Sequence, residues 1–357
     1  PKYLWIKIMA YSSIAKPTDH FNTVLYTGNS TTDTGITGVG FQPDWLWVKS
    51  RGAAESHFLQ DAVRGATKSL KSESTAAEGT DAQNIKSFDS DGFTLGSNDG
   101  VNDSGFNYVS WNWLAGNGTA SNSNGATTST VSANTTAGFS IVSWTGAGSA
   151  TTVGHGLGAA PQVVLVKNRS EVYGWQMYHA SLGNTKYVSI NNTDNAATSS
   201  QSWNDTSPTS TVFTVGASDS NNKSGNSIIA YCFTEKKGYS KFGSYTGNGS
   251  TDGTFVYLGF KPAWLIIKPL ATASHRMWDN KREDYNGNVN QTTINANETG
   301  AEYDNSSVAI DFLSNGFKGR SSGSDISGSS VSYIYMAFAE NPFVGNDSGT
   351  AVPGMAR

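Results

Sequence analysis

Acidic side chains at short spacing are the residues of this chain with the clearest capacity for chemistry. A glycosidase holds two carboxylates roughly 5–10 Å apart, one on each side of the bond that it cleaves. Acidic residues in turns are usually solvated, however, and these do not recur along the chain. We therefore predict a non-enzymatic protein without catalytic residues. The candidates considered were Asp61, Glu73 and Glu78, and a second group of Asp279, Glu283 and Asp284.

The histidines and the one cysteine form no metal-binding pattern. Zinc sites place Cys and His at short fixed spacings, such as C-x-x-C or H-E-x-x-H, and the sequence contains neither. The stretch DSDGF at 89–93 begins like a calcium-binding loop, but the later oxygen ligands and the final Glu do not follow. We interpret it as a hairpin turn, and we expect neither a metal nor a cofactor.

Aromatic residues in loops are the candidate ligand-binding residues. Their flat apolar faces can stack on sugars while neighbouring polar groups donate and accept hydrogen bonds. The alternative for each of them is a ring that folds back onto its own domain. The candidates are Tyr173, Trp203, Tyr285 and Tyr303.

The composition narrows the class of protein. The net charge is −4, so the chain offers no basic surface for nucleic acid or for an anionic membrane. Charged residues make up only 15% of the chain, and Gly, Ser, Thr and Asn replace them, as is common in extracellular and virion β-proteins. No apolar run is long enough to cross a bilayer, and the single Cys232 cannot form an internal disulfide.

One sequence motif occurs three times, at 26–49, 144–167 and 245–268. Each copy carries Thr-Gly, a later Gly, a Pro and a final Lys at identical spacing, and the copies begin about 100–120 residues apart, the size of a small domain. The glycine is expected at positive φ. The final lysines are Lys49, Lys167 and Lys268, each expected to end a buried strand with its ammonium in water.

Two shared strands dominate each copy. DWLWVK, QVVLVK and AWLIIK read as strands buried on both faces, and a closing strand appears at 107–113, 227–233 and 332–338. Alternation along the closing strand places Trp111, Tyr231 and Met336 at equivalent buried positions, and likewise Trp113, Phe233 and Phe338.

Short strands at regular intervals predict an all-β protein with three tandem β-sandwich domains of jelly-roll or concanavalin-like type. A β-propeller is the alternative architecture. The expected segments are an N-terminal arm at 1–19, repeats at 20–116, 138–236 and 238–341, a Gly/Ser/Thr/Asn linker at 117–137 and a tail at 342–357. Residues 1–8, PKYLWIKI, are interpreted as sequence upstream of a native start at Met9, with an edge strand as the alternative.

The motifs GVGFQPDWLWVKSR, DAVRGATKSL, SFDSDGFTLG and YVSWNW, in this order, resemble a repeated module of marine bacteriophage structural proteins. Proteins of this kind occur in phages of cyanobacteria and of abundant ocean bacteria, and many are described as tail fibres. The resemblance covers residues 9–357, and the later copies depart from the DAVRGA motif. It implies a lectin-like sandwich fold and a virion surface protein in a tail or capsid appendage. It supplies no catalytic residues.

The partners expected from this resemblance are other virion proteins, further copies of the same chain and a glycan of the host surface. Nucleic acid and membrane insertion are not expected. The alternative function is a secreted, extracellular bacterial adhesin that binds carbohydrate, or a polysaccharide depolymerase.

Overall fold

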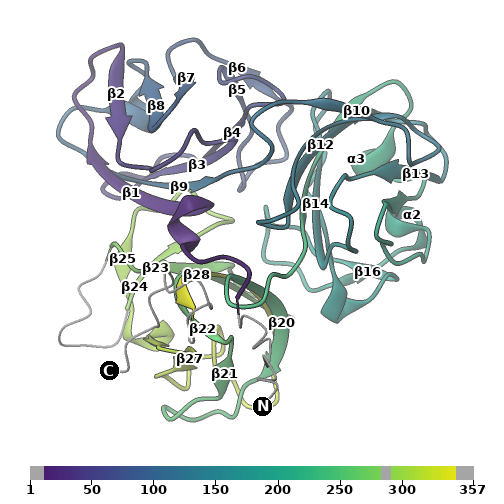
Figure 1. Cartoon of the computed structure of the whole chain (residues 1–357). Helices are drawn as coiled ribbons and strands as arrows, with labels where there is room; N and C mark the ends of the chain where they lie inside the picture. The colour runs from purple at the N-terminus through teal and green to yellow at the C-terminus, as the bar shows by residue number, and fades with distance from the viewer. Residues whose placement is uncertain (1–11, 283–290, 343–357) are drawn as a thin grey trace, which may run out of the picture.

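The computed structural model describes residues 12–282 and 291–342, and it is built mainly from β-strands (Figure 1). The strands form several antiparallel sheets, and none of those in the described residues closes into a barrel. The helices are single turns: α1 (Asp99–Asn102), α2 (Ser200–Trp203), α3 (Asp219–Asn222), η1 (Pro17–Asp19), η2 (Ala180–Leu182) and η3 (Ser306–Val308). The predicted all-β class is confirmed.

Three main sheets have the same strand order, and we refer to the parts of the chain around them as repeats 1, 2 and 3. In each, the first strand pairs with the last, the last with the second long strand, and that strand with the next along the chain. Repeat 1 contains β1 (Phe21–Thr27), β9 (Asn107–Trp113), β3 (Trp45–Ser50) and β4 (Phe58–Asp61). Repeat 2 contains β12 (Phe139–Thr145), β19 (Ser227–Phe233), β14 (Val163–Asn168) and β15 (Gln176–His179). Repeat 3 contains β20 (Ser240–Thr246), β28 (Ser332–Pro342), β22 (Phe260–Pro269) and β23 (Arg276–Asp279).

A small sheet accompanies each main sheet. The three are β2 (Thr34–Thr37), β8 (Gly92–Leu95) and β7 (Ile85–Asp89); β13 (Thr151–Gly154) and β18 (Val212–Val215); and β21 (Phe255–Tyr257), β27 (Gly316–Gly319) and β26 (Ile310–Leu313). A separate hydrophobic cluster lies between the two sheets of each repeat. The stretch DSDGF lies at the turn between β7 and β8, where Asp89 pairs with Gly92, which confirms the predicted hairpin.

The remaining strands lie at the edges or in short ribbons. β24 (Thr292–Asn295) and β25 (Tyr303–Asp304) extend the third main sheet. Two ribbons are formed by β5 (Lys68–Ser69) with β6 (Gly79–Thr80) and by β16 (Lys186–Tyr187) with β17 (Ala197–Thr198). The segment 117–137 differs from the flexible linker that its composition predicts, because it contains β10 (Ala120–Asn122) and β11 (Ser129–Asn134), which extend the second main sheet.

The strand register confirms the predicted equivalence of positions on the three closing strands. Trp113, Phe233 and Phe338 pair with Trp45, Val163 and Trp264, and all three are 1% exposed. Two residues earlier on the same strands, Trp111 and Tyr231 are fully buried. Met336, at the third equivalent position, is partly buried and packs against the same hydrophobic cluster. The glycines before each proline, Gly40, Gly158 and Gly259, have the positive φ expected of them.

One hydrophobic core joins all three repeats. The rings of Phe21 and Phe338 lie 5.3 Å apart between repeats 1 and 3, and those of Phe233 and Phe338 lie 5.9 Å apart between repeats 2 and 3. Trp45 stacks on Tyr231 at 4.4 Å between repeats 1 and 2. The long strands are therefore apolar on both faces, because one face covers the small sheet and the other packs into this shared core. Side chains fill the centre, so the sheets are not propeller blades around a channel.

Candidate functional sites

At one equivalent position in each repeat, a nitrogen of the aromatic side chain forms a hydrogen bond to the backbone of the preceding repeat. Repeat 3 takes the place of the preceding repeat for repeat 1. His57 contacts the carbonyl oxygen of Asn295 at 3.0 Å. Trp175 donates to the carbonyl of Lys71 at 2.9 Å, and His275 contacts that of Ser189 at 3.0 Å. Burial lowers the pKa of His57 and of His275 to about 3, so both rings are neutral. These histidines hold repeats together and are not available as metal ligands.

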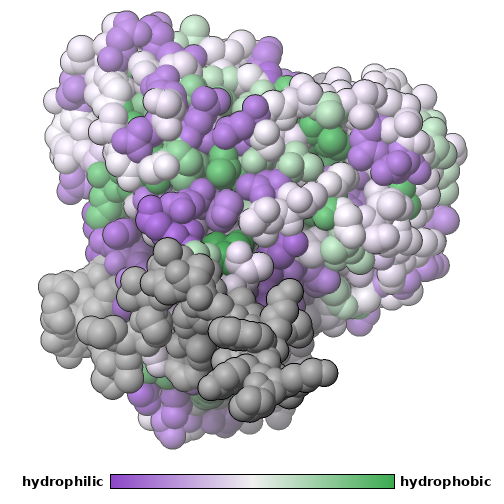
Figure 2. Space-filling view, viewed as in Figure 1, coloured by the Kyte–Doolittle hydropathy of each residue, from purple (hydrophilic) through white to green (hydrophobic). Residues whose placement is uncertain are grey.

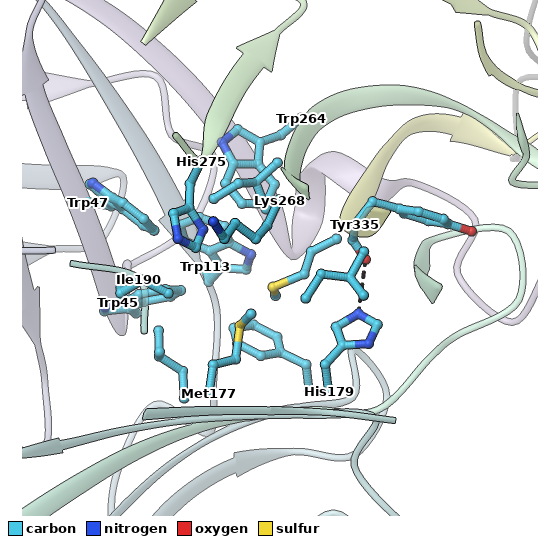
Figure 3. Close-up of a pocket in the computed structure, with 15 residues that line it drawn as sticks. Trp45, Trp47, Trp113, Met177, His179, Ile190, Trp264, Lys268, His275 and Tyr335 are labelled. Carbon is cyan, nitrogen blue, oxygen red and sulfur yellow. Dashed lines mark hydrogen bonds between the residues drawn. The ribbon is translucent and has the colours of Figure 1, made fainter. Parts of the chain in front are cut away.

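The residue that ends the fourth strand of each main sheet contacts the following repeat. Asp61 accepts a hydrogen bond from the Tyr231 hydroxyl at 2.7 Å, and Asp279 accepts one from Trp111 Nε1 at 3.0 Å. In repeat 2 the position is His179, whose Nε2 meets the carbonyl oxygen of Tyr335 at 3.2 Å (Figure 3). Repeat 2 thus has an imidazole at the position where repeats 1 and 3 have a carboxylate.

Ion networks reinforce two of the three boundaries between repeats. Glu78 bridges Arg64 of its own repeat, at 3.2 Å, and Arg169 of repeat 2, at 2.8 Å. Arg64 also binds Asp61, and both side chains are fully buried. The candidate carboxylates Asp61 and Glu78 are therefore both paired with Arg64, which lies between them, and they do not face an open cleft.

The same network recurs between repeats 3 and 1. Glu302 bridges Arg282 at 3.0 Å and Arg51 at 2.8 Å, and Arg282 also binds Asp279 at 2.5 Å. At the corresponding positions, the boundary between repeats 2 and 3 has apolar residues instead of this ion network. These residues, which pack against the shared core, are Leu182, Ala196 and Leu270. Glu73 lies apart and accepts a hydrogen bond from the His57 amide at 3.2 Å, while Glu283 and Asp284 lie outside the described residues.

The ammonium groups of the shared lysines are buried, so the expectation that they reach water is wrong. Lys49, Lys167 and Lys268 are at most 2% exposed, and each ammonium donates to backbone carbonyls. Lys167 reaches Thr75 of repeat 1 at 3.1 Å, and Lys268 reaches Thr193 of repeat 2 at 3.0 Å. Burial lowers the pKa of all three to about 8. The neighbouring repeat closes over the strand ends that carry Lys167 and Lys268, which a single copy cannot reveal.

Neither Ser321 nor Cys232 is placed as an accessible nucleophile. Residues 319–323, GRSSG, match the G-x-S-x-G pattern, but the Ser321 hydroxyl donates to the carbonyl of Ser307 and the residue is 6% exposed. Cys232 is fully buried, and burial raises the pKa of its thiol. Across residues 12–282 and 291–342, no group of three or more His, Cys, Asp or Glu side chains is placed to hold a metal ion.

The candidate loop aromatic residues differ in exposure and in the contacts that they make. Trp203 is 2% exposed and donates from Nε1 to the carbonyl of Lys186 at 3.0 Å, so it has no free face for a sugar. The Tyr173 hydroxyl donates to Asp219 at 3.0 Å, and the ring lies 5.5 Å from the Lys223 ammonium. Tyr303 is 37% exposed. Tyr285 falls outside the described residues.

Tyr303 lies on β25 in a polar environment. The Arg276 guanidinium stands 5.8 Å from the ring centroid and donates to the hydroxyl, and Asn295 donates to the same hydroxyl at 3.3 Å. Arg276 is also paired with Asp325. One face of the ring is therefore occupied by a cation that the protein itself supplies.

The two most exposed aromatic residues in the described part of the chain were not among the sequence candidates. Phe255 and Tyr257 on β21 are 43% and 47% exposed, more than Tyr173, Trp203 or Tyr303. They lie inside the repeated segment 245–268, whereas the candidates were aromatic residues in loops. The signal that would have found them is the comparison of their positions with the small residues of the other copies.

Two cavities in the described part of the chain are a small central one and a polar cleft. The central cavity, about 30 Å³, is lined by all three repeats, including Trp45, Met177 and Trp264 (Figure 3). It has room for about one water molecule and is too small for an organic ligand. The cleft, about 310 Å³, lies between the segment before β1 and the ends of β22 and β28, and Lys16, Lys281 and Glu340 line it.

The visible surface is polar. On the face in Figure 2, hydrophilic and weakly hydrophobic side chains dominate, and strongly apolar residues appear in small groups. No helix within residues 12–282 and 291–342 has the length and apolar character that crossing a membrane requires.

Comparison with known proteins places the chain in a family. The family model described as "Domain of unknown function (DUF7483)" matches residues 16–342. No curated protein matches the chain. The matched range includes all three main sheets, in agreement with a core that the three repeats share. On this match, which covers most of its length, the chain belongs to the DUF7483 family.

Proposed function

We propose that the protein is a non-enzymatic structural component of a bacteriophage virion, in a tail fibre or another surface appendage, and that it binds a glycan of the host surface. The observation that carries the proposal is that its reactive side chains are engaged in contacts between repeats. Buried carboxylates, histidines and lysines that the sequence offers for chemistry bind across the boundaries between repeats, among them Asp61, His57 and Lys167.

Rigidity is the property that these contacts supply. Side chains with paired partners on two repeats fix the repeats relative to each other, and the shared aromatic core leaves no hinge between them. A virion appendage has to keep its shape outside the cell, where a polar surface with few charges is common. In this proposal the architecture is three concanavalin-like sandwich repeats fused into one body, and further copies of the chain and other virion proteins are its partners.

Protein analysis of purified particles tests the proposal. Phage particles from a host that carries this gene would be purified by density-gradient centrifugation, and their peptides quantified by mass spectrometry. We expect this chain to sediment with the capsid protein at a constant ratio. Its absence from particles, with secretion into the medium by a bacterium, would contradict the proposal and favour an extracellular bacterial adhesin.

Activity measurements test the non-enzymatic part. Purified protein incubated with host envelope polysaccharide should release no reducing sugar. Release that disappears in Asp61→Asn or Asp279→Asn variants that remain folded would show that these carboxylates are catalytic.

A further inference from the structure

The small sheet of repeat 3 presents an exposed aromatic pair on its outer face. Phe255 and Tyr257 flank the buried Val256 on β21. Because side chains alternate along a strand, both rings point to the same, outer side. Within the described residues, β21 is also the edge strand of its sheet.

The other repeats carry no aromatic residue at these positions. The register identifies the equivalents, since Val256 pairs with Phe317 as Ile36 pairs with Phe93 and Val153 with Phe213. Around this inward-facing residue the shared fold needs only small side chains. The positions of the two rings are taken by Gly35 and Thr37 in repeat 1 and by Thr152 and Gly154 in repeat 2.

In repeats 1 and 2 the corresponding face is closed or polar. In repeat 2 the chain itself covers it, because the Ala126 amide donates to the Thr152 hydroxyl at 2.9 Å and Thr127 forms a bridge with Val153. In repeat 1 the outer side chains bind one another, with Asp89 accepting hydrogen bonds from Ser87 and Thr94. Only repeat 3 turns two large rings of this face outward.

The surroundings of the rings resemble a shallow platform. The Lys241 ammonium lies 5.4 Å from the Tyr257 ring centroid and donates to the Tyr257 carbonyl at 2.7 Å. Gly316, opposite Tyr257, has no side chain, and a Cβ there would approach the Phe255 ring to 3.1 Å. Lys318, opposite Phe255, is paired with Asp252 at 2.6 Å.

We propose that this face, the aromatic platform formed by Phe255, Tyr257, Lys241 and Lys318, binds a polysaccharide of pyranose sugars. The apolar face of a pyranose ring stacks on an aromatic ring, and the polar groups at the rim can bind the sugar hydroxyls. The inference rests on the proposed function only in taking a glycan of the host surface as the natural ligand.

The size of the platform favours a sugar over a protein partner. A stable protein interface covers about 800 Å² on each partner around an apolar centre. Here the exposed large apolar side chains are two half-exposed rings, and the charges beside them are already paired, Lys318 with Asp252 and Arg320 with Asp311. Two rings are enough to stack on consecutive sugars of a glycan chain.

Binding of purified full-length protein to an array of bacterial and algal polysaccharides tests the proposal. The double variant Phe255→Ala/Tyr257→Ala should lose roughly ten- to a hundredfold in affinity for the glycan that the wild type binds, since two stacking contacts are removed. Phe106→Ala removes a 36%-exposed ring from repeat 1 and is the matched control, with binding unchanged. Both variants remove exposed side chains, so their unfolding temperatures should stay within a few degrees of the wild type.

Three outcomes would overturn the proposal. Equal binding by the double variant and the wild type would show that the glycan site lies elsewhere, with Tyr303→Ala as the next variant to compare. Binding of no array glycan by the wild type would remove the glycan from both proposals, while membership of the virion keeps its own test. A wild-type oligomer in solution that the double variant dissociates would identify the face as an interface between copies.

Discussion

The carboxylate of Asp61 accepts a hydrogen bond from the hydroxyl of Tyr231 at 2.7 Å, across the boundary between repeats 1 and 2. Both side chains are fully buried, and Arg64 contacts both of them. The bond therefore belongs to a closed network in which every partner depends on the others.

Replacing Tyr231 by Phe should lower the free energy of unfolding by about 1–3 kcal/mol, because a buried carboxylate loses a donor. Chemical denaturation of the folded variant measures this. Tyr173→Phe is the control, since its hydroxyl bond to Asp219 is exposed and should contribute little. Equal stability of the two variants would show that the buried bond adds nothing.

Replacing Arg64 alone by Leu should cost about 3–5 kcal/mol, because Asp61 remains buried without its cation and Glu78 keeps only Arg169. The boundary between repeats 2 and 3 provides the comparison, since it has Leu182, Ala196 and Leu270 at the corresponding positions. The combined variant D61N/R64L/E78A/R169L should therefore recover most of the lost stability. A combined variant that is less stable than R64L would refute the interpretation.

The three buried lysines should make the protein more stable as the pH rises from about 8 to about 10. Their pKa is about 8 in the folded state and 10.5 when exposed, so in this range the unfolded chain binds more protons. The cost of burying the ammonium is fully present below pH 8 and is relieved as pH rises. We expect a gain on the order of 1 kcal/mol for each lysine in urea unfolding. The triple variant K49M/K167M/K268M should lose this dependence.

Trp113→Ala should cost about 3–5 kcal/mol, the range for a large buried aromatic residue. Because the Trp113 ring contacts Phe338 at 5.7 Å and Trp45 at 4.5 Å, the loss affects more than one repeat. Calorimetry of the wild type should show one unfolding transition, and the variant should shift this transition as a whole. Separate transitions for the three repeats would show that they fold independently.

The alternation of side chains along the closing strands was sufficient to predict the buried equivalent positions. Trp113, Phe233 and Phe338 could be assigned from spacing alone, because a period of two fixes which side of a strand a residue occupies. The same pattern could not say what lies opposite that face. A face that packs on another repeat and a face that packs on its own small sheet have the same composition.

Contacts that form only in the folded chain, within a repeat and between repeats, account for most of what the sequence did not reveal. Lys167 ends an apolar strand and looks solvated when its repeat is considered alone, yet its ammonium donates to the carbonyl of Thr75 in repeat 1. Trp203 follows a polar loop and turns inward to Tyr178 at 5.9 Å. Phe255 and Tyr257 lie within the repeated segment 245–268, outside the loops from which the candidate aromatic residues were taken.

The direction of the contacts between repeats limits how such a molecule can grow. Repeat 1 contacts repeat 2 through Asp61, and repeat 3 contacts repeat 1 through Asp279, so the same head-to-tail contact returns to its starting point. A head-to-tail contact that closes makes a ring, whereas one that does not close makes an open filament. This ring is complete at three members and has no free end for a fourth. A fourth repeat can therefore enter this ring only if one of the three boundaries opens, and copies of the chain can associate only through the outer surface of the closed ring.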